Sequence, residues 1–231
     1  MKKIKTALIS VSNKKKLAMI LPVLKKFKIE IISSGGTFKS IKKLGFKSTE
    51  LSEYTNFPEI LDGRVKTLHP KIHAGILSKR NKTSHKKQLK SYNFKEIDLV
   101  IVNFYPFEEI MKGSKNKSNI IENIDIGGPS MVRGAAKNYE NVTVITSIDQ
   151  YEDLKNELSK NLGSTSLNFR QKMSQKAFIE TGYYDSVIAN YFLKITKKNF
   201  PSKKLIYANK IDDLRYGENP HQIAAVYSTV L

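Results

Sequence analysis

The sequence predicts an α/β fold built on a parallel β-sheet. Over the first 150 residues, short runs rich in β-branched residues alternate with stretches that have helical spacing of apolar residues. This alternation is typical of β–α–β units, whose strands pair in parallel. The run "DLVIVNFY" (98–105) is almost continuously apolar, as expected for a strand in the middle of such a sheet. From about Asp149 the pattern is helical only.

The expected elements follow in order along the chain. Strands are expected at 6–11, 29–33, 98–105 and 141–147, and helices at 13–27, 35–45, 126–138, 149–162 and 167–195. Pro22 lies inside the first helix as an irregularity, Gly45 ends the second, and Pro106 ends the third strand. Residues 61–77 show neither a helical stripe nor strand alternation and are expected to form a loop. Pro201 marks a boundary, after which the tail does not continue the helices.

The composition is that of an ordinary globular chain without cysteine chemistry. Of the 231 residues, 40% are hydrophobic and 26% charged, which allows a substantial buried core. The absence of Cys excludes disulfides, thiolate metal sites and a Cys nucleophile. The basic start is followed by an apolar run too short for a signal peptide or a membrane span, and no other segment qualifies. A cytoplasmic location is therefore expected.

The net charge of +19 raises the question of nucleic-acid binding. Only five of the 40 basic residues are Arg, however, and base-edge or bidentate phosphate recognition favours Arg. The lysines occur in pairs and triplets along the expected surface helices, and no nucleic-acid motif accompanies them. A solvated, Lys-rich surface is the preferred interpretation. Long-range attraction of an anionic small substrate or of nucleic acid remains the alternative.

Two turns predict an anion site. "SVSNK" (10–14) and "SSGGT" (33–37) each follow an expected strand and precede an expected helix, where ligands settle in open α/β sheets. Hydroxyls of Ser10, Ser12, Ser34 and Thr37, the amides of the Gly pair and the Lys14 ammonium suit a phosphate. The alternative is helix capping, a normal role for Ser, Thr and Asn. Neither turn matches a nucleoside-triphosphate or dinucleotide motif.

The stretch "LDGRVKTLHPKIHAGIL" (61–77) concentrates basic and imidazole side chains, including Arg64, Lys66 and His69. It is interpreted as a segment that binds an anion beside a reacting centre, with ordinary loop charge as the alternative. A zinc site at His69 and His73 is not expected. Pro70 between them breaks the helix that such a pair needs, and no glutamate completes a motif.

Two further segments carry candidate groups. "NFYP" (103–106) places Asn103 and Tyr105 at the carboxyl end of the central strand, although Tyr105 could equally cover the end of the sheet. "IDIGGPSMVRGAAKN" (124–138) places Asp125 just before a Gly-Gly helix start and Lys137 near the end of that helix. Capping by Asp125 and a dipole contact of Lys137 are the alternatives.

These segments together resemble one family. "SVSNK", "SSGGT", "DGRVKTLHPKIHAGIL", "NFYPF", "IDIGGPSMVRGAAKN" and "LRYGENPHQ" occur in the order and at the intervals found in the bifunctional AICAR transformylase/IMP cyclohydrolase family. The resemblance runs from about Thr6 to His221 and covers the N-terminal half of the family. "GRVKTLHPKIHAGIL" is its most specific part.

The resemblance implies a fold and a domain division. The fold is similar to methylglyoxal synthase, a three-layer α/β arrangement in which a parallel sheet is flanked by helices. Residues 1–199 would form the IMP cyclohydrolase domain, and residues 200–231 a linker and the truncated start of the transformylase domain. Arg215 and Tyr216 match residues that contact AICAR. The body that uses 10-formyltetrahydrofolate would be missing, so formyl transfer is expected to be absent.

The resemblance also implies a reaction, the closure of formyl-AICAR ribotide (FAICAR) to IMP with loss of water, at the end of de novo purine synthesis. No metal or organic cofactor is implied, and a homodimer is possible. The catalytic positions are Lys137, Lys66, Tyr105 and Asp125. The substrate-binding positions are Ser10, Ser12, Asn13, Lys14, Ser34, Gly35, Gly36, Thr37, Arg64, Val65, Thr67, Val102, Asn103, Ile126 and Gly127. Asn13 stands where the family commonly has Asp, and Pro129 differs from some relatives at a first-turn position that tolerates Pro.

Three other functions remain open. A methylglyoxal synthase would need a carboxylate base acting on a triose phosphate, whereas these positions are rich in Lys and Ser with Asp125 as the main acid. A nucleotide-sensing domain, of the kind found on carbamoyl-phosphate synthetase, would bind IMP without turnover. A nucleic-acid binder driven by the net charge would show steep salt dependence and indifference to IMP.

Overall fold

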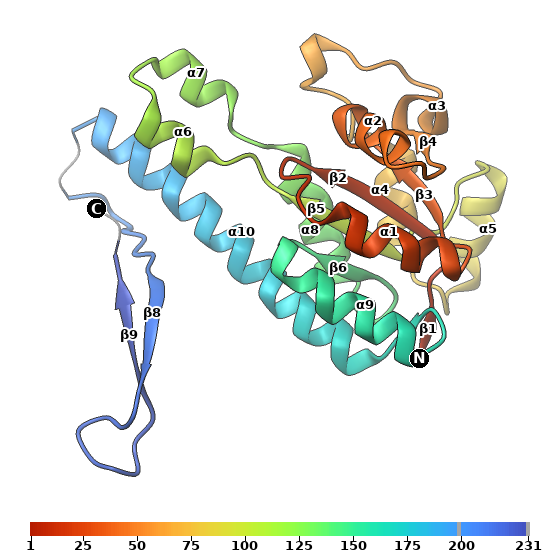
Figure 1. The fold of residues 1–231 in the computed structure, drawn as a ribbon. Helices are drawn as coiled ribbons and strands as arrows, with labels where there is room; N and C mark the ends of the chain where they lie inside the picture. The colour runs from red at the N-terminus through yellow and green to blue at the C-terminus, as the bar shows by residue number, and fades with distance from the viewer. Residues whose placement is uncertain (198–199, 230–231) are drawn as a thin grey trace. The chain divides into compact units, whose positions relative to one another are not determined.

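The computed structural model describes residues 1–197 and 200–229. The chain divides into two compact units, Met1–Thr181 and Gly182–Leu231. The first unit is built on a five-stranded sheet in the order β4-β3-β2-β5-β6, and every neighbouring pair in it is parallel (Figure 1). This confirms the predicted α/β fold with a parallel sheet.

The strands of the sheet are short and the central ones are almost fully buried. They are β2 (Thr6–Val11), β3 (Glu30–Ser33), β4 (Thr49–Glu50), β5 (Leu99–Asn103) and β6 (Thr143–Ile145). Ser10 pairs with Val102 and Val11 with Asn103, so β2 and β5 end side by side. Because all five strands are parallel, the residues that follow them gather at one edge of the sheet. A separate antiparallel pair joins β1 (Lys2–Lys3) to β7 (Ser164–Thr165).

Helices cover both faces of this sheet. The longer ones are α1 (Leu17–Lys26), α2 (Gly35–Lys43), α4 (Pro70–Leu77), α5 (Thr83–Ser91), α8 (Gly127–Lys137), α9 (Tyr151–Lys160) and α10 (Leu167–Ile195). Shorter ones are α3 (Leu51–Thr55), α6 (Phe107–Gly113), α7 (Lys117–Glu122) and the 3₁₀ turns η1 (Leu61–Gly63) and η2 (Ile148–Gln150). Figure 1 shows α1 beside α9 in front of the sheet, with α4 beside α8 behind it. The core between these layers is aliphatic.

Two expectations about helices are wrong in detail. The first helix begins at Leu17 rather than Asn13, because Asn13 is held by Asn103 and Lys16 takes a left-handed conformation with φ 61°. Residues 70–77, expected to be a loop, form α4. Pro70 occupies its first turn, where a missing N–H is harmless, and the His69 Nδ1 atom accepts a hydrogen bond from the Lys71 N–H at 3.1 Å. His69 and His73 therefore do not share one helix.

A buried ion pair ties the sheet to α4. Arg80 is only 6% exposed, and its guanidinium donates to the carbonyls of Gly75 at 3.1 Å and Ile97 at 2.7 Å. Its nearest contact with the Asp98 carboxylate is 3.9 Å. Asp98 also accepts hydrogen bonds from the N–H groups of Lys5 and Thr6, where β2 begins. Burial lowers the pKa of Arg80 and raises that of Asp98, so both charges are costly to bury and depend on these partners.

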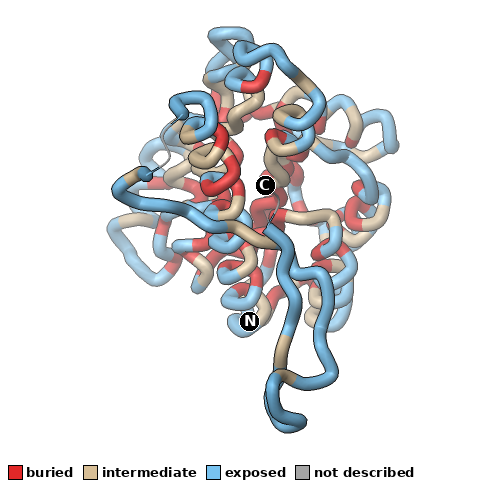
Figure 2. Tube along the Cα trace, turned by 90° about the vertical axis from the view of Figure 1, so that its left-hand side faces the viewer, coloured by how far each residue is buried: buried red, intermediate tan, exposed pale blue. Residues whose placement is uncertain are grey.

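The second unit contains the end of α10 and an antiparallel ribbon of β8 (Asn209–Leu214) and β9 (Ala224–Ser228). All but one of the eleven residues of these two strands are exposed, and the ribbon is mostly pale blue in Figure 2. Arg215 and Tyr216 follow β8 directly. The expected domain boundary after residue 199 falls at residues 198–199, outside the described residues, and stays a prediction. Within the described residues, no helix is long and apolar enough to cross a membrane.

Candidate active site

A polar cleft of about 590 Å³ opens at the edge of the sheet where the strands end. Five stretches of chain supply its walls: the end of β2 with the turn after it, the end of β3 with the turn after it, residues 62–67, the end of β5 with the turn after it, and residues 121–131. It is lined by Ser10, Val11, Ser12, Lys14, Ser34, Gly36, Thr37, Asp62, Gly63, Arg64, Lys66, Thr67, Asn103, Tyr105, Ile121, Glu122, Ile124, Asp125, Ile126, Gly127, Gly128 and Met131. The topology thus brings together most of the positions that the sequence singled out.

One end of the cleft carries hydroxyls and a lysine beside a helix N-terminus. The Ser10 and Ser34 hydroxyls are 2.7 Å apart, and the Lys14 ammonium donates to the Ser12 carbonyl at 3.1 Å while lying against Gly36. Among the described residues, no side chain caps α2, so the capping alternative for Ser34 is not observed. The first turn of α2 adds a positive dipole end to this group. The arrangement suits a phosphate.

Thr37 has a different role from the one expected. Its hydroxyl accepts from the Val11 N–H at 3.0 Å and donates to the Val11 carbonyl at 3.2 Å. These bonds join α2 to the end of β2 and occupy the hydroxyl. Thr37 therefore positions the turn.

Asn103 fixes the turn after β2. Its amide donates to the Asn13 carbonyl at 3.0 Å, and its amide oxygen accepts from the Asn13 N–H at 2.8 Å. The Asn13 side chain accepts from the Lys15 N–H at 3.0 Å. Asn13 thus shapes the turn without lining the cleft. Asn103 shapes the turn and also lines the cleft.

The other end of the cleft gathers Lys66, Tyr105 and Asp125. Asp125 accepts from the Gly128 N–H at 2.8 Å, which places its carboxylate at the start of α8. Burial raises the pKa of Asp125, although backbone N–H groups of Gly128 and Tyr105 and the charge of Lys66 act in the opposite direction. Burial also lowers the pKa of Lys66, but the hydrogen bond that its ammonium donates to Glu59 and the charges of Tyr105, Glu59 and Asp125 outweigh this effect, so the pKa of Lys66 is raised. An acid with a raised pKa and a stabilised ammonium thus lie in one cleft.

A second ion pair crosses the rim of the cleft. The Arg64 guanidinium contacts both carboxylate oxygens of Glu122, with 3.0 Å between Nε and Oε1. Both residues line the cleft, and the hydrogen bond raises the pKa of Arg64 and lowers that of Glu122. Thr67 packs so closely on Gly127 that a Cβ there would lie 2.1 Å from its hydroxyl oxygen. This contact requires glycine at the first position of α8.

Comparisons with known proteins agree with this geometry. A profile for an MGS-like domain matches residues 17–130, and one for the AICARFT/IMPCHase bienzyme matches residues 135–230. The bifunctional purine biosynthesis protein PurH of Oceanobacillus iheyensis is 47% identical over 224 residues, covering 96% of this chain. The PurH proteins of Listeria monocytogenes and Elusimicrobium minutum are 48% and 45% identical, over 97% and 98% of this chain. The chain belongs to the AICARFT/IMPCHase family.

The match to the AICARFT/IMPCHase family concerns one part of its members. The chain spans 44% of the length of each of these three relatives. The first unit contains an MGS-like domain, because the residues that match this profile all lie within it. A solved structure titled "Crystal structure of ForH" superposes with a TM-score of 0.72 at 29% identity, covering 82% of this chain and 99% of that one.

Several positions expected from the AICARFT/IMPCHase family lie outside the cleft. Lys137 lines a second hollow of about 480 Å³ with Arg133, Gly134, Ala136, Tyr139, Ser174 and Phe178. It ends α8, ten residues after Gly127, and the helical rise separates these two positions by about 15 Å. The expectation that one chain gathers Lys14, Lys66 and Lys137 in a single site is therefore wrong for Lys137. Its catalytic role stays a prediction.

The remaining expected positions do not line the cleft. Gly35, Val65 and Val102 do not line it: Val102 is buried in the sheet, and the Val65 backbone pairs with that of Ile60. Arg215 and Tyr216 belong to the second unit.

Some cleft residues were missed by the sequence analysis. Glu122 and Asp62 line it, and Glu59 contacts Lys66 at 3.1 Å without lining it. Glu122 carries no signal in the sequence, because its partner Arg64 lies 58 residues away. Asp62 lies within the stretch 61–77 that was singled out, and Glu59 lies two residues before it. Within the described residues, no three His, Asp or Glu side chains gather as a metal site would need.

Proposed function

We propose that this chain closes FAICAR to IMP and water. The observation that carries the proposal is the composition of the cleft. Groups suited to binding a phosphate lie at one end, and Lys66, Tyr105 and Asp125 lie at the other. A ribotide has a phosphate at one end and reacting groups at the other, so both ends find suitable partners. Membership of the AICARFT/IMPCHase family and the name of the PurH relatives support a purine substrate.

The proposed reaction joins two arms of one molecule. The carboxamide nitrogen attacks the formyl carbon, a C–N bond forms, and negative charge develops on the former formyl oxygen. That oxygen receives one proton from the attacking nitrogen and one from the former formamide nitrogen. The C–O bond then breaks, water leaves, and a C=N bond forms between the former formyl carbon and the former formamide nitrogen. A carboxamide is a poor nucleophile, so alignment matters most and can supply about 7–11 kcal/mol. Each donor aimed at the developing oxyanion adds about 3 kcal/mol.

The cleft residues take separate roles in this proposal. Lys66 stabilises the oxyanion, Tyr105 donates to the formyl oxygen, and Asp125 orients the carboxamide. The phosphate is held by Ser10, Ser12, Lys14, Ser34 and the first turn of α2. The reaction as proposed needs no metal or organic cofactor, since no electron or group carrier takes part in it.

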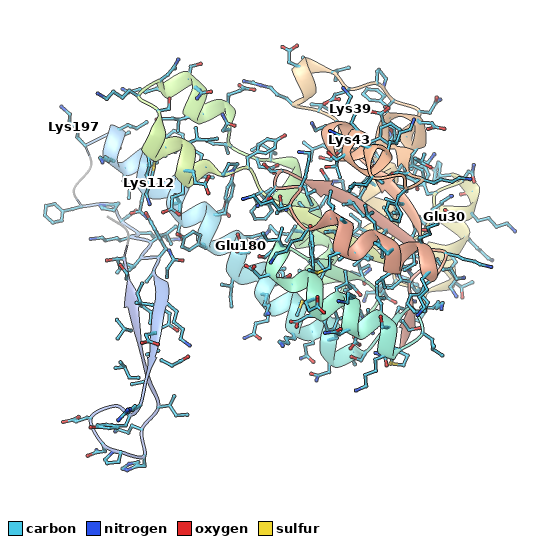
Figure 3. The ribbon with its side chains drawn as sticks, viewed as in Figure 1. Glu30, Lys39, Lys43, Lys112, Glu180 and Lys197 are labelled. Atoms are coloured by element: carbon cyan, nitrogen blue, oxygen red, sulfur yellow. The ribbon has the colours of Figure 1, made fainter. Side chains whose placement is uncertain are left out.

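A turnover assay tests the proposal against its rivals. The purified chain should convert FAICAR to IMP, followed by ultraviolet absorbance, without added cofactor. IMP binding with no turnover would instead indicate a nucleotide-sensing domain. Methylglyoxal formation from a triose phosphate would indicate a methylglyoxal synthase. Nucleic-acid binding that depends steeply on salt and is unaffected by IMP would support the charge-driven alternative. The exposed lysines are spread over separate elements, as Lys39 and Lys43 on α2 and Lys112 on α6 illustrate in Figure 3.

The proposal includes a homodimer that supplies Lys137. In one chain Lys137 opens onto the second hollow, away from the cleft. A second copy whose Lys137 hollow faced this cleft would add the catalytic lysine that the family resemblance implies, which in this proposal donates a proton. In a two-fold symmetric dimer, each contact between the subunits occurs twice. The dimer would therefore have two equivalent sites.

Mixed dimers test this arrangement. A dimer of one Lys66→Ala chain and one Lys137→Ala chain, purified by two different tags, should retain about half of the wild-type kcat because one of its two sites is intact. A dimer of a wild-type chain and a chain with both substitutions should be nearly inactive. If each site instead used its own Lys137, the second dimer would retain half of the activity and the first would lose it.

A further inference from the structure

Glu59 holds Lys66 from outside the lining of the cleft. The Glu59 carboxylate accepts a hydrogen bond from the Lys66 ammonium at 3.1 Å, across the turn formed by residues 60–65. The backbones of Ile60 and Val65 pair between them, with N–H to carbonyl distances of 3.3 and 3.4 Å. The ends of the turn are therefore fixed independently of the ion pair. Lys66 lines the cleft, but Glu59 does not.

The turn is shaped around this ion pair. Leu61, Asp62 and Gly63 all have positive φ values, of 55°, 55° and 88°. Non-glycine residues rarely adopt this region, and they do so mostly where the surroundings impose it. A Cβ on Gly63 would lie 2.5 Å from the Glu59 carboxylate oxygen and 3.6 Å from the Lys66 ammonium. Glycine at this position leaves the space that the two charged groups fill.

We propose that Glu59 is a positioning residue for the cyclisation, one that keeps Lys66 protonated and fixed in the cleft without touching the substrate. The inference rests on the proposed function, in which Lys66 acts as a cation on the developing oxyanion. An ammonium that lost its proton at the working pH would lose this role, because a neutral amine offers far less stabilisation to an anion.

Three acidic groups from different elements act on Lys66. Glu59 comes from the turn, Tyr105 from the segment after β5, and Asp125 from the start of α8. Tyr105 and Asp125 face the substrate in the proposal, so their interactions with Lys66 change as substrate binds. Glu59 is the partner whose contact is independent of substrate. It therefore offsets the burial that disfavours the ammonium in both the free and the occupied cleft.

Competitive acetylation tests the pairing directly. The pH dependence of Lys66 labelling, read by mass spectrometry, should show a midpoint about 1 pH unit lower in Glu59→Gln than in the wild type. Glu122→Gln is the matched control. It also removes one negative charge near the cleft, but Glu122 pairs with Arg64 and not with Lys66. Its Lys66 midpoint should stay at the wild-type value. An unchanged midpoint in Glu59→Gln would overturn the proposal.

Kinetics test whether the pairing serves the reaction. Glu59→Gln should lower kcat about tenfold with little change in KM, and the alkaline limb of the kcat profile should move to lower pH. Glu59→Asp, which keeps the charge, should restore the position of that limb. A uniform loss at every pH would indicate a structural role only and would contradict the proposal. Absence of FAICAR turnover in the wild type would refute the proposed function, while the labelling result would still decide whether Glu59 controls Lys66.

Discussion

Replacing Lys66 with Met is expected to lower kcat for FAICAR cyclisation by about 10²–10³-fold while KM changes little. Methionine keeps much of the length and apolar volume of the lysine stem but removes the charge. In the proposed mechanism that charge acts mainly on the oxyanion, which exists in the transition state and not in bound FAICAR. Loss of an interaction made only in the transition state lowers kcat and kcat/KM together. Steady-state kinetics at saturating FAICAR measures the effect.

Lys14→Met serves as the matched control for this prediction. Lys14 lies at the phosphate end of the cleft, beside Ser12 and Gly36. Its contact with a phosphate is the same in substrate and transition state, so its removal should raise KM and weaken IMP binding with kcat nearly kept. If Lys66→Met raised only KM, or if Lys14→Met lowered only kcat, the assignment of the two ends of the cleft would be wrong.

Replacing Arg80 with Met is expected to lower the free energy of unfolding by about 3–5 kcal/mol. The substitution leaves the buried Asp98 carboxylate without its cation and removes the Arg80 donor from the carbonyls of Gly75 and Ile97, of which Gly75 keeps the Ile97 N–H at 3.1 Å. Burial already raises the pKa of Asp98, so this carboxylate depends on the partners that remain. Urea unfolding followed by circular dichroism should show a lower midpoint at an unchanged m-value.

The control removes an ion pair at the surface. Lys95 and Glu30, which is labelled in Figure 3, approach to 2.6 Å with side chains that are 54% and 61% exposed. Lys95→Met should therefore cost only about 0–1 kcal/mol. Equal losses in the two variants would show that the buried pair contributes no more than a solvated one.

The sequence predicted the sheet better than the connections between its layers. The run at 98–105 became β5 because a parallel central strand is apolar on both faces, and residues 167–195 form α10 at the expected bounds. Residues 70–77 were missed because α4 has only two turns and an imidazole cap, which weakens the apolar period. The antiparallel pair of β1 and β7 depends on contacts between residues some 160 apart, which local patterns do not reveal.

The candidate site was predictable where it follows strands. Ser10, Ser34 and Asn103 reach the cleft because parallel strands end at one edge, a consequence of topology that the strand pattern already implies. Glu122 was not predictable, because its position depends on how α7 is placed against residues 60–66. Lys137 was placed in the site by family resemblance, and only the length of α8 showed that one chain does not bring it there.

Helix α8 begins two residues after an acid, Asp125, and ends at a lysine, Lys137, and each of these two residues borders a different hollow. A short helix moves as a stiff rod, because its hydrogen-bonded turns resist stretching. The Asp125 carboxylate and the Lys137 ammonium are joined through the backbone of this one eleven-residue helix. In the proposed dimer, α8 would therefore contribute its start to one site and its end to the other.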